Sequence, residues 1–139
     1  SNCLYFGRVA SMIQGLELIK KFVEEIDLGI VLNNWTGGCI IRSSLLNELN
    51  DINSSSKDFI NDSKLNKIFK DNLNSTKKVI SQAVLSTIST PVLSASFNWY
   101  LNLSSLSNPA NLIQAQRDFF GRHKLQLIDS EEDVNIDWD

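Results

Sequence analysis

The sequence predicts an all-α protein of about six helices followed by an extended C-terminal tail. Apolar residues recur at three- and four-residue steps along most of the chain, which is typical of amphipathic helices. Two dipeptides, Thr90-Pro91 and Asn108-Pro109, each place a capping residue before a proline and therefore predict helix starts. With 139 residues, 42% of them hydrophobic, the chain can bury a core without disulfides or a structural metal.

Two helices are expected in the first part of the chain. The first covers about residues 3–26 and ends where Asp27 and Gly29 interrupt the apolar pattern. A short apolar run follows at residues 30–32. The second helix is expected to begin near the paired glycines 37–38, which permit backbone conformations that other residues resist. Its apolar stripe comprises Ile41, Leu45, Leu49 and Ile52.

Two more helices are expected after a polar stretch. Residues 53–63 are rich in Ser, Asn and Asp and predict a loop, with Asp62 or Ser63 capping the helix that follows. Ser75 is expected to cap a separate helix further on. The apolar face of the first of these helices comprises Leu65, Ile68, Phe69 and Leu73. That of the second comprises Val79, Ile80, Ala83, Val84 and Ile88.

The C-terminal part is expected to contain the last two helices and the tail. The helices begin at Pro91 and Pro109, and Gly121 is expected to end the second of them. Residues 124–128 are the one place where the pattern allows a strand. The predicted organisation is therefore a partial all-helical domain over residues 1–128 and an acidic tail over residues 129–139.

The net charge of −3 is unevenly distributed. The tail, residues 129–139, contains six acids and no base, which leaves ten acids against 13 bases in residues 1–128. One interpretation of the tail is a solvated acidic end. The other interpretation is that residues 1–128, here called the body, prefer an anionic ligand while the tail reaches a partner. The body is not basic enough to indicate nucleic acid, and no apolar stretch is long enough to span a bilayer.

Residues that commonly carry catalysis are sparse in this chain. It has no G-x-G-x-x-G, no glycine-rich phosphate loop with lysine and no H-E-x-x-H. Its single histidine, His123, excludes a multi-histidine metal site, and no metal is expected. No nucleophile elbow favours a Ser-His-Asp triad, and Cys39, among apolar neighbours, is expected to be an inert thiol. The low cysteine content and the lack of a signal-peptide pattern predict a cytoplasmic location.

Arg117 and His123 are the candidate functional residues. A guanidinium binds phosphate or carboxylate through two parallel hydrogen bonds, and an imidazole can add another donor to the same anion. The two residues would not share a face of a continuous helix. If the helix ends at Gly121, however, His123 can fold back toward Arg117. The alternative from the residues alone is a local pair between Arg117 and Asp118, with His123 as an ordinary surface residue.

Two segments resemble the C-terminal part of the decarboxylating 6-phosphogluconate dehydrogenase family. Residues 35–42, W-T-G-G-C-I-I-R, resemble the family's W-R-G-G-C-I-I-R. Residues 108–123, N-P-A-N-L-I-Q-A-Q-R-D-F-F-G-R-H, resemble its P-A-N-L-I-Q-A-Q-R-D-Y-F-G-A-H, a long contiguous match. Gln14-Gly15 also fits the family's A-Q-G. The resemblance extends over nearly the whole chain.

The resemblance implies both an activity and a role for the two candidate residues. Members of this family oxidise 6-phosphogluconate with NADP and release carbon dioxide to give ribulose 5-phosphate. They are homodimers formed largely through the helical domain, and the tail of each subunit threads into the other. Arg117 and His123 match family positions that enter the partner's active site and contact the substrate, chiefly its phosphate. Gly37, Gly38 and Arg42 are interpreted as helix-junction packing and ion pairing.

The chain also departs from the family pattern. It lacks the NADP-binding Rossmann domain and the K-x-x-x-N-G segment that carries the family's catalytic lysine and glutamate. It therefore contains no predicted catalytic residue, and NADP would be bound mainly by the missing N-terminal domain. We expect a fragment that is inactive alone, supplying a dimer interface and phosphate-binding residues. The alternatives are a non-catalytic helical dimerisation or scaffold module and one half of a split enzyme. Cutting the helical domain should also expose apolar faces and promote self-association.

Overall fold

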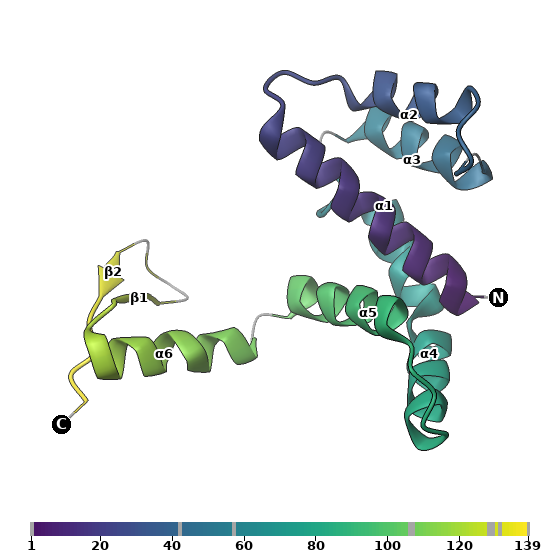
Figure 1. The fold of residues 1–139 in the computed structure, drawn as a ribbon. Helices are drawn as coiled ribbons and strands as arrows, with labels where there is room; N and C mark the ends of the chain where they lie inside the picture. The colour runs from purple at the N-terminus through teal and green to yellow at the C-terminus, as the bar shows by residue number, and fades with distance from the viewer. Residues whose placement is uncertain are drawn as a thin grey trace. The chain divides into compact units, whose positions relative to one another are not determined.

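The fold is all-α, as the sequence predicts. A computed structural model describes residues 2–41, 43–56, 58–105, 108–127, 130 and 132–138. Two compact units make up the chain, Ser1–Tyr100 and Leu101–Asp139, here called the N-terminal and C-terminal units. The predicted division at residue 128 falls inside the C-terminal unit. The described part contains six helices, α1 (Asn2–Phe22), α2 (Leu28–Thr36), α3 (Ser44–Ser55), α4 (Ser63–Leu85), α5 (Pro91–Ser104) and α6 (Pro109–Gly121), and two short strands, β1 (Leu125–Gln126) and β2 (Asp133–Val134) (Figure 1).

The core of the N-terminal unit lies where α1 crosses α4 and where α2 pairs with α3 (Figure 1). Phe6 on α1 is completely buried, with its ring edge against Phe69 of α4 at 5.1 Å between centroids and against Tyr100 at 5.5 Å. Aromatic rings prefer such edge-to-face contacts because the positive ring edge meets the negative ring face. Aliphatic side chains complete the core, among them Ile13, Leu16, Leu32, Leu45, Leu49 and Leu65.

The region after the first helix differs from the sequence-based prediction. α1 ends at Phe22 instead of residue 26. Three residues further on, Glu25 is left-handed, with φ of 57°, so a right-handed helix does not extend to residue 26. The run at 30–32 belongs to a helix, α2. Asp27, interpreted as a break, is its N-cap, because its carboxylate accepts a hydrogen bond of 2.8 Å from the Gly29 amide.

The glycine pair ends α2 and does not begin the next helix. The amide of Gly37 donates to the Asn34 carbonyl at 3.2 Å, and Gly38 has a φ of 152°, which L side chains rarely adopt. The following helix, α3, begins only at Ser44 and ends at Ser55, so it includes the first three residues of the loop expected over residues 53–63. Arg42, for which an ion pair was expected, lies outside the described residues.

The long helix α4 replaces the two helices predicted between residues 63 and 88. Its start is confirmed, because the Asp62 carboxylate accepts from the amides of Lys64 and Leu65. The predicted cap at Ser75 is wrong. Thr76 is buried and its hydroxyl donates to the Asn72 carbonyl at 2.9 Å, one turn back, so the helix continues through this polar stretch. The described part still contains the predicted six helices, because two predicted helices form the single helix α4 while α2 was not predicted.

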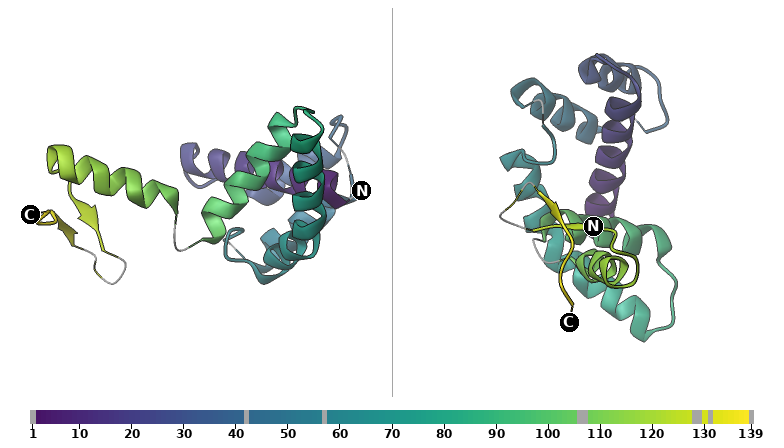
Figure 2. Two further views of the ribbon diagram at one scale, coloured as in Figure 1. Left: turned by 90° about the horizontal axis from the view of Figure 1, so that it is seen from below. Right: turned by 90° about the vertical axis from the view of Figure 1, so that its left-hand side faces the viewer.

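The C-terminal unit consists of the end of α5, α6 and the strand pair. Asn108 caps α6 as predicted, accepting from the Ala110 amide at 2.9 Å, and Pro109 is its first residue. After α6 the chain forms β1, which pairs antiparallel with β2 through Leu125 opposite Val134. The strand pair lies beside α6 (Figure 2). The strand expected at 124–128 is thus found only at 125–126, and Ile128 lies outside the described residues.

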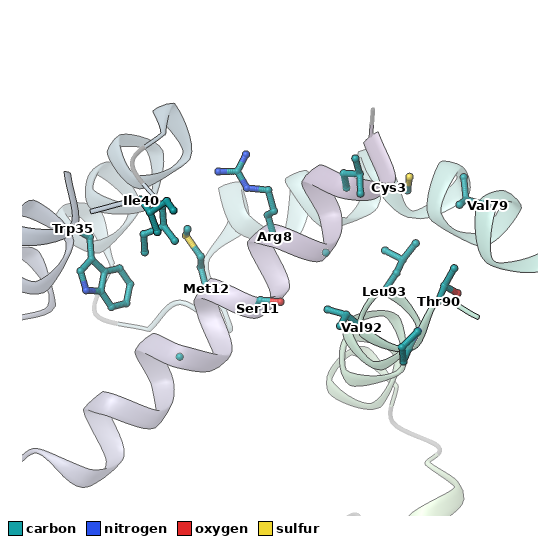
Figure 3. A pocket seen from close by; sticks show the side chains of 15 residues that line it. Cys3, Arg8, Ser11, Met12, Trp35, Ile40, Val79, Thr90, Val92 and Leu93 are labelled. Atoms are coloured by element: carbon teal, nitrogen blue, oxygen red, sulfur yellow. The ribbon is translucent and has the colours of Figure 1, made fainter. Parts of the chain in front are cut away.

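A wide apolar groove of about 920 Å³ opens along one face of α1 (Figure 3). Its walls include Leu4 and Met12 of α1, Trp35 of α2 and Val92 of α5. Ile40, on the rim, is fully exposed, and Leu4 and Val92 are also exposed. The expected exposure of apolar surface is therefore present. In the part of the chain that the structure describes, no helix combines the length and the apolar character that a membrane span requires.

Self-association of the isolated chain is the predicted consequence of this groove. Contiguous apolar surface of this kind is seldom left open on a monomer. We expect light scattering to give a mass above the 15.6 kDa of one chain, increasing with protein concentration. Val92→Glu, which places a charge in the groove near the start of a helix, should lower that mass without loss of helical circular dichroism. A wild-type mass of one chain at every concentration would contradict the prediction.

Alkaline pH should weaken the contact between α1 and α3. The Tyr5 hydroxyl donates to Glu48 at 2.5 Å, and burial, together with this hydrogen bond and the negative charge of Glu48, raises the Tyr5 pKa to about 12. Because the Tyr5 pKa in the folded state lies above its ordinary value, the hydrogen bond from Tyr5 to Glu48 contributes its full stabilisation below about pH 10. That stabilisation is lost as the pH rises toward 12. The stability advantage of the wild type over Tyr5→Phe, measured by urea unfolding, should shrink across this range. An advantage independent of pH would contradict the assignment.

Candidate anion-binding site

The C-terminal end of α6 brings Arg117 and His123 into one depression. Arg117 lies on the last turns of the helix, and His123 follows two residues after its end. Both side chains are exposed, and with Gln116, Phe120 and Gly121 they line a hollow of about 370 Å³. The chain reversal that allows His123 to approach Arg117 is therefore present.

A left-handed turn produces this reversal. The expectation that Gly121 ends the helix is met, but the left-handed residue is Arg122, with φ of 49° and ψ of 45°. Its amide donates to the Asp118 carbonyl at 2.8 Å, which closes the last turn of α6. Lys124 is also left-handed, with φ of 56°, so two such residues flank His123.

Gly121 provides space for the imidazole. A Cβ atom at this position would lie 2.7 Å from Cδ2 and 2.8 Å from Nε2 of His123, closer than carbon atoms approach in proteins. The imidazole therefore packs directly against the end of α6, where only a glycine leaves room. The close packing of the ring, rather than an unusual backbone angle, accounts for the glycine here.

Gln114 connects Arg117 to the turn. Its Oε1 accepts from the Arg117 guanidinium at 3.1 Å, and its Nε2 donates to the Lys124 carbonyl at 2.5 Å. One side chain thus restrains both the guanidinium and the backbone beside His123. The local pair between Arg117 and Asp118, considered from sequence, is not formed, because the Asp118 carboxylate is directed to other donors.

Asp118 is the buried charged residue of α6, with only 1% of its surface exposed. Its Oδ1 accepts from the Lys124 amide at 3.0 Å, and its Oδ2 accepts from the Ile136 amide at 2.8 Å and the Trp138 indole at 3.0 Å. Burial by itself would raise the pKa of Asp118. These three hydrogen bonds, together with the charge of Arg122, outweigh burial and hold the pKa below its usual value.

The arrangement is suited to binding a small anion. A guanidinium offers a planar fork of donors, and an imidazole offers one N–H when neutral and two when protonated. The nearby carboxylate, Asp118, already accepts three hydrogen bonds and faces away from solvent, so it competes little for Arg117. Among the described residues, no group of His, Cys, Asp and Glu could hold a metal ion.

Gly121→Ala should displace the imidazole while leaving α6 intact. Alanine favours helix by about 1 kcal/mol over glycine, so the helix itself should not weaken. The clash at 2.7 Å should nevertheless push the ring outward, which would change the NMR shifts of the His123 ring and remove its contacts with residue 121. Gly15→Ala in α1 is the matched control, because a Cβ there meets nothing within 4 Å. Unchanged His123 signals in Gly121→Ala would contradict the packing described here.

The fold and the site together define an all-α domain that presents a guanidinium and an imidazole in one depression at a helix end. The family described as "6-phosphogluconate dehydrogenase, C-terminal domain" matches residues 1–138. The chain therefore belongs to the 6-phosphogluconate dehydrogenase family and corresponds to its C-terminal domain, as the sequence motifs predict.

Individual relatives agree with this assignment. Decarboxylating 6-phosphogluconate dehydrogenases from Buchnera aphidicola and Lactococcus lactis are each 33% identical, matching 99% of this chain and 31% and 30% of their own lengths. The solved structure of the Plasmodium falciparum enzyme, described in apo form and in complexes with NADP+ and 6-phosphogluconate, superposes with a TM-score of 0.86 at 32% identity. It matches 99% of this chain and 31% of its own. The chain thus spans about a third of the length of these relatives.

The sequence predicts that Arg117 and His123 come together, as they do in this depression, but it does not predict the residues that support them. Asp118 was considered only as a neighbour of Arg117, Gln114 was given no role, and Gly121 was assigned only the helix end. The sequence around Asp118 carries no local signal for its role, because Phe119 and Phe120 beside it are exposed and its partners Ile136 and Trp138 lie 18 and 20 residues away.

Proposed function

We propose that this chain is the C-terminal part of an NADP-dependent 6-phosphogluconate dehydrogenase and that Arg117 and His123 bind the phosphate of 6-phosphogluconate. The proposal is carried by the convergence of these two side chains on one depression in a chain that belongs to this family. A phosphate monoester carries a charge near −2 at neutral pH and accepts charge-assisted hydrogen bonds from such groups. The reaction of the whole enzyme would be oxidative decarboxylation to ribulose 5-phosphate.

The reacting groups of that enzyme would come from outside this chain. The family's catalytic lysine and glutamate belong to a segment that this sequence lacks. NADP has no fitting site among the described residues, because their only strands are two residues long and no glycine-rich turn joins a strand to a helix. We therefore assign the cofactor to another part of the enzyme and give this chain substrate binding alone.

The proposed partner is a second copy of this chain. α6 carries a set of large apolar side chains that its own unit leaves more than half exposed, namely Leu112 (74% exposed), Ile113, Phe119 and Phe120 (77% exposed). Exposed apolar surface of this kind is typical of association sites. Phe120 also lines the depression, so a partner packed on α6 would border the anion site. This supports a homodimer in which each C-terminal unit completes the other subunit's active site. A cytoplasmic location, expected from the sequence, is part of the same proposal.

Ligand titration of the 139-residue chain tests the proposal. Two charge-assisted donors contribute about 3–6 kcal/mol together, which corresponds to a Kd of about 1 mM. Adding 6-phosphogluconate should shift the NMR signals of the Arg117 and His123 side chains with a common Kd in this range, and gluconate without the phosphate should not. The chain alone should not reduce NADP. Equal shifts with gluconate, or robust NADP reduction by the chain, would refute the proposal.

A further inference from the structure

We propose that Asp118 is a positioning residue that holds His123 in the anion site and ties this site to the docked C-terminal segment. The inference rests on the proposed function of Arg117 and His123 and extends it to a residue that faces away from the anion. Three observations support it: how the carboxylate oxygens are shared, the backbone around His123, and the packing of the residues before the C-terminus.

The two carboxylate oxygens serve different segments. Oδ1 accepts from the Lys124 amide, the residue directly after His123. Oδ2 accepts from the Ile136 amide and the Trp138 indole, which belong to the C-terminal segment. One buried carboxylate therefore joins the end of α6, the turn and the C-terminal segment, which are otherwise separated by up to 20 residues of chain.

The backbone around His123 needs external support. Arg122 and Lys124 are both left-handed, with φ of 49° and 56°, and this conformation is unfavourable for residues other than glycine. Both amides are held by the same residue, because Arg122 donates to the Asp118 carbonyl and Lys124 to its carboxylate. Asp118 thus stabilises both unfavourable residues that direct the imidazole onto Gly121 and beside Arg117.

The C-terminal segment closes over the other side of the carboxylate. The Trp138 ring packs edge-to-face with Phe119 at 6.0 Å between centroids, so the indole is held by this ring contact as well as by its hydrogen bond. Asn135 accepts a second hydrogen bond from the Lys124 amide at 3.2 Å. The segment therefore secures the turn both directly and through Asp118.

The test compares Asp118→Asn with Asp137→Asn by NMR on the full chain. Asparagine keeps the shape of Asp118 but replaces one acceptor oxygen with a donor, so either the turn or the C-terminal segment loses its partner. We expect at least a tenfold rise in the Kd for 6-phosphogluconate, loss of the contact between the His123 ring and Gly121, and a shift of the Trp138 indole proton. Asp137 is exposed and lies in the C-terminal segment. Asp137→Asn removes the same charge as Asp118→Asn, so this variant should bind 6-phosphogluconate like the wild type.

Trp138→Phe provides the second variant. It retains a ring to pack on Phe119 and removes one donor to Oδ2, so its Kd should lie between those of the wild type and Asp118→Asn. Wild-type binding by Asp118→Asn, or a tenfold loss in Asp137→Asn as well, would overturn the positioning role while leaving the proposed function standing. Failure of the wild-type chain to bind 6-phosphogluconate would overturn both.

Discussion

Replacing Arg117 with alanine is expected to weaken binding of 6-phosphogluconate about 10- to 100-fold. Under the proposed function, the substitution removes one charge-assisted partner of the phosphate, and such a partner contributes about 1.5–3 kcal/mol. It should do so without unfolding α6, because the guanidinium is exposed and its contact within the described part of the chain is the single hydrogen bond to Gln114. In an enzyme that contains this chain, the KM for 6-phosphogluconate should rise while the affinity for NADP is retained.

Two controls distinguish a phosphate contact from a general effect of charge. Lys78→Ala removes the same charge from an exposed position on α4, in the other unit, and should change the Kd by less than about twofold. Arg117→Lys keeps the charge but loses the planar fork, so its Kd should lie between those of the wild type and Arg117→Ala. Equal losses in Arg117→Ala and Lys78→Ala, or equal effects on 6-phosphogluconate and NADP, would contradict the assignment.

The sequence was sufficient to select the two residues that line the depression but not those that hold them in place. Arg117 and His123 stand in a contiguous motif whose chemistry is visible in the residue types. The roles of Asp118 and Gln114 depend instead on contacts with Lys124, Ile136 and Trp138, between 6 and 20 residues away. No periodic pattern along the chain encodes such contacts, because they form only when a turn of two left-handed residues reverses the chain.

The difference between local sequence signals and contacts distant in sequence also explains the errors in the predicted fold. Where a capping side chain precedes proline, as at Asn108, the local signal alone places the helix start correctly. Asp27 and Ser75 carry equally good capping side chains with opposite outcomes. Asp27 begins α2, whereas Ser75 lies in the interior of α4, where the hydroxyl of Thr76 bonds within the helix. Burial of Leu32 and of Thr76 in the core of the N-terminal unit decides between these outcomes, and that burial is not local.

The acidic tail acquires a more specific interpretation from the structure. Of its described acids, Glu132, Asp133 and Asp137 are exposed, so the docking of this segment does not use their carboxylates. Docking uses the backbone of Ile136 and the indole of Trp138, both directed to a carboxylate on α6. The acids therefore remain available to solvent or to a partner. The position of the segment is explained by Asp118, whereas nothing in the described contacts explains its charge.

Replacing Phe6 with alanine should have the largest effect on stability of any substitution considered. Phe6 is completely buried against Phe69 and Tyr100, whose rings also stack on each other at 4.7 Å, and Phe→Ala substitutions at such positions cost about 3–5 kcal/mol because a cavity remains. Domains of this size are stable by only about 5–15 kcal/mol, so a substantial part of the stability of the N-terminal unit would be lost. Urea unfolding followed by circular dichroism should show a large drop in the midpoint.

Phe22→Ala is the matched control for this prediction, because the same substitution is made at the exposed end of the same helix. Phe22 is 75% exposed, and its removal should change the stability by no more than about 0.5 kcal/mol. Comparable losses in both variants would mean that α1 contributes through helix formation alone. A loss confined to Phe6→Ala would establish that the aromatic contacts among α1, α4 and α5 hold the N-terminal unit together.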